Sequence, residues 1–325
     1  MRAILLLLML LATAAGGMAA EIQDQADRSH LQWGPPQIVQ LKVGLVIKAT
    51  GSPLIDLTAM TPVPRDWPEQ TVRQIGQEAS PQVARITFVD VGSTVRRMVV
   101  HIPRLGPTET ARAVVLYEVT RRALLVPRHP EDYAVPPRAG RELRPYLSGS
   151  PYIETKRSQI RKVAREAVEG VEGDWQKVEA IYDWVRDHVQ YQRGPIKGAF
   201  AALRDGTGDC EELSSLFIAM CRVNNIPART VWVPDHCYPE FYLTDSRGQG
   251  SWFPCQAAGT RAFGTIPEFR PILQKGDNFR LPELPKPQRY VAEYLQIRDV
   301  PGGNNPEVSF IRDVSGDAGV ARGGP

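Results

Sequence analysis

The sequence predicts an α+β fold, in which a strand-rich first half precedes a half that mixes helices and strands. Residues 37–126 contain short runs of β-prone residues separated by Gly and Pro, as strands and turns do. Residues 155–189 carry apolar positions at three- and four-residue steps, which is typical of amphipathic helices. A further helical pattern follows residue 210, and alternating, strand-like runs occur at 236–243 and 252–256. These observations predict a β domain followed by a second domain of mixed structure.

The first 20 residues have the pattern of a secretory signal peptide. A basic start at Arg2 precedes an apolar run at 4–11, and an alanine-rich stretch ends at Ala20. The apolar run is shorter than a membrane span requires, and an uncleaved anchor is the alternative interpretation. We therefore expect a mature chain that begins near Glu21, is secreted or periplasmic, and has no membrane span after cleavage.

The chain has 325 residues, of which 42% are hydrophobic, and this suffices for two domains with cores of their own. Residues 30–126 predict an antiparallel β-sandwich, immunoglobulin-like in outline, which packs against the second domain and positions it. Residues 127–150 are rich in Pro, Arg and Gly and predict a linker to a domain at 151–299. The Gly-rich residues 300–325 predict a disordered tail.

The charge of the chain gives no indication of a nucleic-acid partner. The formal net charge is +3, and the Lys and Arg residues are spread along the sequence instead of clustering. No pattern in the sequence indicates an oligomeric state.

Cys210 is the residue around which the second domain is organised. The Gly-rich segment before it ends in Asp209, a favourable N-cap, so that Cys210 falls at the first helical position. The positive end of the helix dipole favours a thiolate at this place. Downstream, His236 begins one alternating run and Gln256 ends the next. A cysteine at a helix start, then a histidine on a strand, then a polar residue on the next strand is the order of a catalytic triad.

Residues 175–259 resemble the core motif of the transglutaminase-like superfamily. The resemblance rests on Cys210 and its helix, on Asn-Ile-Pro-Ala-Arg at 225–229, on His-x-Tyr-x-Glu at 236–240 and on Trp-Phe-Pro at 252–254. It implies a papain-like domain with a Cys-His-Asp triad. Cys210 and His236 match the first two members, and the position of the family's Asp is occupied by Gln256.

The resemblance also places residues 191–193 beside the nucleophile. There Tyr191 or Gln192 could assist in stabilising an oxyanion. The backbone N–H of Cys210, at the start of the helix, is the other candidate donor.

Gln256 leaves two functions open. A side-chain amide can orient an imidazole, as the Asn of Cys-His-Asn proteases does, and a thiolate can itself stabilise the imidazolium. The first hypothesis is a cysteine protease or acyl transferase that acts on a protein or peptide through a Cys210 thioester, with hydrolysis preferred. The second is a catalytically degenerate binding or scaffold module. We expect no cofactor and no metal, because no EF-hand loop is visible.

All four cysteines lie between positions 210 and 255. Cys210 and Cys221 are separated by about 16 Å along one helix and cannot form a disulfide. Strand alternation predicts that Cys237 and Cys255 both face away from the catalytic cleft and lie close together. They would then be either a disulfide or thiol pair, or two independent core thiols. A zinc site is not favoured, because no C-x-x-C spacing occurs.

Overall fold

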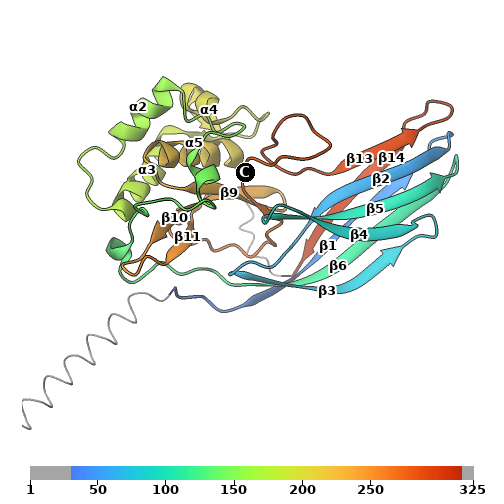
Figure 1. Cartoon of the computed structure of the whole chain (residues 1–325), viewed down its shortest axis with the longest axis horizontal. Helices are drawn as coiled ribbons and strands as arrows, with labels where there is room; N and C mark the ends of the chain where they lie inside the picture. The colour runs from blue at the N-terminus through green and yellow to red at the C-terminus, as the bar shows by residue number, and fades with distance from the viewer. Residues whose placement is uncertain (1–30, 317–325) are drawn as a thin grey trace, which may run out of the picture.

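The computed structural model describes residues 31–316 and shows an elongated molecule, with strands at one end and helices at the other (Figure 1). The signal peptide predicted for residues 1–20 lies outside this range, as do residues 317–325. Between residues 31 and 316, none of the helices has the length and apolar character needed to cross a membrane. Antiparallel sheets combined with packed helices confirm the predicted α+β class.

The strand-rich end is an antiparallel β-sandwich, as predicted. Its strands are β1 (Gln37–Lys48), β2 (Leu54–Val63), β3 (Gln70–Ala79), β4 (Arg85–Val91), β5 (Val95–Leu105), β6 (Thr110–Arg121), β13 (Tyr294–Asp299) and β14 (Glu307–Ser315). One layer has the order β14-β1-β6-β3, and β4, β5, β2 and β13 form the other. On β1, Leu41, Val43 and Leu45 are fully buried while Lys42 is exposed, which is the period-two pattern of a half-buried strand. Each buried aliphatic side chain contributes about 1.5–3 kcal/mol.

The helical end is built around α5, which packs on a small antiparallel sheet. Its helices and short 3₁₀ turns are η1 (Pro130–Asp132), η2 (Arg144–Leu147), α2 (Ser158–Glu166), α3 (Asp174–His188), α4 (Ala199–Asp205) and α5 (Cys210–Val223). Its strands are β7 (Gln190–Tyr191), β8 (Thr207–Gly208), β9 (Ala228–Val233), β10 (His236–Thr244), β11 (Gly250–Pro254) and β12 (Gln274–Lys275). Leu216 and Phe217 of α5 belong to the same buried core as Phe241 of β10 and Phe253 of β11. The positions at three- and four-residue spacing after Cys210 therefore face the sheet.

A continuous sheet joins the two ends of the molecule. Its strand order is β11-β10-β9-β12-β5-β2-β13, and β4 pairs with β5. The short strand β12 makes the connection, because Gln274 lies opposite both Val95 of β5 and Trp232 of β9. The division into separate domains, predicted from composition, missed this connection, since a two-residue strand carries no periodicity that the sequence could reveal.

The disordered tail predicted for residues 300–325 is wrong for much of its length. Residues 307–315 form β14, which pairs antiparallel with β1 at the edge of the sandwich. Phe310 and Val314 pack against the sandwich core. The strand has alternating β-prone residues, and the Gly-rich segments on both sides of it concealed that pattern in the composition. Similarly, residues 294–299 belong to the sandwich as β13, not to the second domain.

The predicted linker at 127–150 lies on the helical end as an ordered strap. Ala134 forms a two-hydrogen-bond bridge with Thr244, at 2.9 and 2.8 Å between N and O. The buried ring of Tyr133 packs edge-on against Phe253, with 5.0 Å between ring centroids. Pro and Gly in this segment therefore shape an irregular but packed path.

Candidate active site

The first turn of α5 fixes the position of Cys210. Asp209 is the N-cap, and its carboxylate accepts a hydrogen bond from the Glu211 N–H at 2.8 Å. The Glu212 carboxylate returns to the Asp209 N–H at 3.1 Å, which completes a capping box. Cys210 is thus the first helical residue, half-buried, as the Gly-rich lead-in and Asp209 predicted.

The two glutamates of this turn each have a partner other than the thiol. Glu212 also accepts a hydrogen bond from the Lys197 N–H at 2.9 Å, and Glu211 pairs with Arg289. Burial nevertheless raises the pKa of Glu211 to about 7, and the charge of Cys210 adds to this rise although Arg289 opposes it, so a charged Glu211 and the thiolate disfavour each other.

His236 is the first residue of β10 and follows a tight turn from β9. Asp235 in that turn has a left-handed backbone, with a φ of 57°, and Val233 lies opposite His236. The His236 ring Nε2 lies 3.3 Å from Gln256 Oε1. A neutral or protonated ring that donates from Nε2 to this carbonyl oxygen leaves Nδ1 for Cys210. Cys210, His236 and Gln256 therefore lie together, in the order that the sequence predicted.

Gln256 is held firmly by helix α3. Its backbone carbonyl accepts hydrogen bonds from the Tyr182 hydroxyl at 2.8 Å and from Arg186 Nη1 at 3.0 Å. Its N–H donates to the Ala262 carbonyl at 2.8 Å, and the Ala262 N–H in turn donates to the Tyr182 hydroxyl. These bonds fix the backbone from which the Gln256 amide reaches the imidazole.

Neighbouring groups favour a thiolate at Cys210. The pKa of Cys210 is lowered to about 4, chiefly by a hydrogen bond from the Cys237 side chain. Burial of the thiol acts in the opposite direction, and the hydrogen bond and charge of His236 lower the pKa further. For His236, burial lowers the pKa, but the hydrogen bond and charge of Cys210 and the charge of Glu268 outweigh burial and raise it above its ordinary value. The pair therefore exists as thiolate and imidazolium from about pH 4 up to the raised pKa of His236.

Cys237 faces Cys210, which corrects the prediction that it faces away from the cleft. Its Sγ lies 4.0 Å from Ser214 Oγ on α5, and it hydrogen-bonds to Cys210. Cys255 lies opposite Pro239 instead, with 3.0 Å between the Cys255 N and the Pro239 O, so it is two residues away from Cys237 along the strand. All four thiols are free, and no Cys237–Cys255 pair forms. The prediction placed the rear of the strand away from Cys210, whereas Cys237 lies on the face of β10 that packs on α5, the helix that begins with Cys210.

Cys221 lies in the core, as expected. It is fully buried on α5, and burial raises the pKa of its thiol well above the ordinary value. Such a thiol is unreactive.

Glu268 is a site residue that the sequence did not reveal. Its Oε2 lies 3.9 Å from His236 Nε2, and its carboxylate also pairs with Arg270. The side chain is buried and comes from an irregular segment beyond β11. That segment has no periodicity, so the sequence offers one signal of a charged residue near His236, namely that Glu268 is the single acidic residue of the segment. Glu268 supplies the negative charge near the imidazole that Gln256 lacks.

The segment at 191–193 lies beside the approach to Cys210, as the resemblance implied. β7 pairs parallel with β8, and the Gln192 N–H donates to the Gly208 carbonyl at 2.7 Å. Tyr191 is 53% exposed, and its side chain hydrogen-bonds with Arg193. The backbone N–H of Cys210 belongs to the first helical turn, whose N–H groups have no acceptor within the helix. An oxyanion role for each of these groups stays a prediction.

Comparison with known proteins defines the class of the site. Residues 161–257 match the family model of the transglutaminase-like superfamily. The chain therefore contains a transglutaminase-like domain, which confirms the resemblance inferred from the motifs around Cys210 and His236. No curated protein matches the chain.

A solved structure shows that the fold recurs. A protein from Cytophaga hutchinsonii, described as a proposed cysteine protease, is 17% identical with a TM-score of 0.61, over 88% of this chain and 92% of that one. The coverage includes the β-sandwich, so the two-part architecture as a whole is shared. The periplasmic domain of TgpA from Pseudomonas aeruginosa, bound to ethylmercury, is 14% identical with a TM-score of 0.31, over 63% of this chain and 89% of that one.

Proposed function

We propose that this chain is an exported cysteine-dependent enzyme that cleaves or transfers acyl groups at amide bonds of a protein or peptide. The observation that carries the proposal is the group of Cys210, His236 and Gln256 at the start of α5, with Cys210 favoured as a thiolate. The Met1–Ala20 pattern motivates export, and the transglutaminase-like domain indicates acyl transfer chemistry.

The chemistry follows from the positions of these groups. The Cys210 thiolate attacks the amide carbonyl and forms a carbon–sulfur bond, and the Cys210 N–H is placed to stabilise the oxyanion. The His236 imidazolium gives its proton to the leaving amine as the carbon–nitrogen bond breaks. Water then attacks the thioester while His236 takes its proton as general base, and cleavage of the carbon–sulfur bond releases the acid and restores the thiolate–imidazolium pair. An amine in place of water gives a new amide, and hydrolysis is the outcome we favour.

A binding or scaffold module is the second candidate, because Gln256 stands at the position of the family's Asp. The charge of Glu268 near His236 favours the enzyme instead. Acyl transfer through a thioester requires a cysteine paired with a histidine, and this pair is present. An amide orients the histidine, and a nearby carboxylate stabilises its charged form.

The test of the proposal is the rate of iodoacetamide labelling at Cys210, measured as a function of pH. Peptide mass mapping reports the labelling. We expect a midpoint near the pKa of about 4 and a higher midpoint in His236→Ala. Reaction through the thioester is followed with casein as the substrate. Cleavage of casein indicates hydrolysis, and incorporation of a fluorescent alkylamine into casein indicates capture by an amine. A midpoint at the free-thiol value of about 8.5, with neither cleavage nor amine incorporation, would favour the binding module.

A further inference from the structure

A cavity of about 160 Å³ lies where the β-sandwich meets the helical end of the molecule. Glu69 and Arg121 line it from the sandwich, and Arg229, Glu240 and Lys275 line it from the other side. Neither Cys210, His236 nor Gln256 is among its lining residues. A volume of this size accommodates about ten water molecules, or a ligand with a similar number of non-hydrogen atoms.

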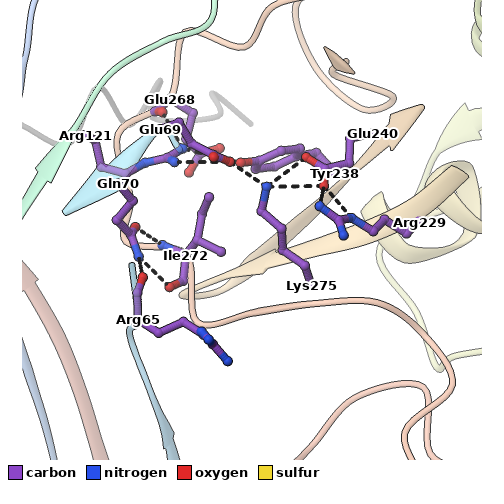
Figure 2. Close-up of polar contacts among 10 residues, drawn as sticks. All are labelled: Arg65, Glu69, Gln70, Arg121, Arg229, Tyr238, Glu240, Glu268, Ile272 and Lys275. Atoms are coloured by element: carbon purple, nitrogen blue, oxygen red, sulfur yellow. Dashed lines mark hydrogen bonds and ion pairs between the residues drawn. The ribbon is translucent and has the colours of Figure 1, made fainter. Parts of the chain in front are cut away.

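Most of the charged groups in the cavity wall neutralise one another (Figure 2). Lys275 Nζ lies 2.5 Å from Glu69 Oε1 and 3.0 Å from Glu240 Oε2, and Arg229 pairs with Glu240. Burial would raise the pKa of Glu69, but Lys275 and Arg121 together lower it to about 2, so this carboxylate stays ionised. Two carboxylates are therefore matched by Lys275 and Arg229.

Arg121 is the cation that this network leaves without a full partner. Its side chain is 2% exposed, and its Nη1 lies 4.0 Å from Glu69 Oε1. Nη2 makes two long hydrogen bonds, at 3.3 Å to the Tyr238 hydroxyl and 3.4 Å to the Glu268 carbonyl. Within the described part of the chain, Nε and Nη1 have no hydrogen-bond acceptor. A buried guanidinium whose only ion pair is long, and whose Nε and Nη1 lack acceptors among the described residues, is costly, because the charge has lost its water.

The rest of the wall is largely apolar. Trp252 lies flat against the Arg229 guanidinium, 3.9 Å from its carbon to the ring centroid, and Leu124, Pro254 and Ile266 complete this side. Arg122 adds a further cation at the wall, so the lining residues include four basic and two acidic side chains. An anion with an apolar body matches both features of the cavity.

We propose that this cavity binds a small monocarboxylate with an apolar body, whose carboxylate pairs with Arg121. A guanidinium is the side chain best suited to a planar carboxylate, because it offers parallel N–H donors. The ligand is either a free acid or the carboxylate at the end of a peptide. The cavity is separate from the proposed catalytic group, since its lining residues do not include Cys210, His236 or Gln256.

The test uses the mature chain and 3-phenylpropionate, with 3-phenylpropanamide as the uncharged analogue, in isothermal titration calorimetry. We expect the acid to bind in the micromolar to millimolar range, and Arg121→Met to weaken it about tenfold or more, because a charge-assisted pair is lost. Arg112→Met is the matched control, since Arg112 lies on the same strand β6 but does not line the cavity. Cys210→Ala should bind like the wild type, which separates this site from the proposed catalysis.

A second variant guards against misfolding of Arg121→Met. Ala123→Leu adds volume at a cavity-lining position while leaving Arg121 in place, and we expect it to weaken binding of the acid as well. A shift of the Trp252 indole N–H resonance on titration would place the ligand in this cavity. A peptide that ends in a phenylalanine carboxylate, against the same peptide amide, distinguishes the two sources of ligand. Equal binding of acid and amide, unchanged binding in Arg121→Met, or no binding of either acid or peptide in the millimolar range would overturn the proposal.

Discussion

Replacing Cys237 with alanine should raise the pKa of Cys210, because the Cys237 side chain is the largest influence that lowers it. Cys237 itself stays protonated, since burial raises the pKa of its own thiol well above the ordinary value, so it can donate to the thiolate. A hydrogen bond to a charged group is worth about 1.5–3 kcal/mol, and 1.36 kcal/mol corresponds to one pH unit. The pKa of Cys210 should therefore rise from about 4 to about 5 or 6.

The measurement is the second-order rate of iodoacetamide labelling at Cys210 between pH 3 and pH 9, which rises as the thiolate forms. Cys255→Ala is the matched control, because it removes another buried thiol of the same region that does not contact Cys210. Thermal unfolding of both variants checks that each one folds. A midpoint that is the same in Cys237→Ala and in the control would refute the argument that Cys237 stabilises the thiolate.

Three further predictions concern the surroundings of the site. Gln256→Glu places a carboxylate 3.3 Å from the imidazole and should raise the pKa of His236 by about one unit. Glu268→Gln removes a nearby negative charge and should lower the pKa of His236. The two variants should therefore move the upper limb of the pH–activity profile in opposite directions. An NMR titration of the His236 ring measures both changes, and shifts in the same direction would contradict this reasoning. Gln256→Ala should lose about tenfold or more in activity, because the ring is no longer oriented; undiminished activity would remove Gln256 from the site. Arg222→Met should cost about 3–5 kcal/mol in urea unfolding, because it leaves the buried Asp277 unpaired. The exposed Arg204→Met is the control, and a loss of under about 1 kcal/mol in Arg222→Met would contradict the estimate.

Local sequence signals were enough to group Cys210, His236 and Gln256. The N-cap Asp209 and the apolar spacing after it predicted that α5 starts at Cys210, because capping and periodicity act over a single helical turn. Strand alternation predicted β10 and β11, which carry His236 and lead to Gln256. The β-sandwich followed from repeated short strands. Each of these features depends on residues that are close in the sequence.

Contacts between distant segments were decided only by the tertiary structure. Glu268 reaches His236 from an irregular loop, and β14 returns to β1 across more than 250 residues. The cavity around Arg121 forms because β12 joins the two ends of the molecule in one sheet. Cys237 lies beside Cys210 because its face of β10 packs on α5, a contact between elements that strand alternation alone does not encode. The sequence by itself determined the helix that begins at Cys210 and the β-sandwich. The charges around the imidazole and the cavity arise from pairings between distant segments, which local periodicity does not encode.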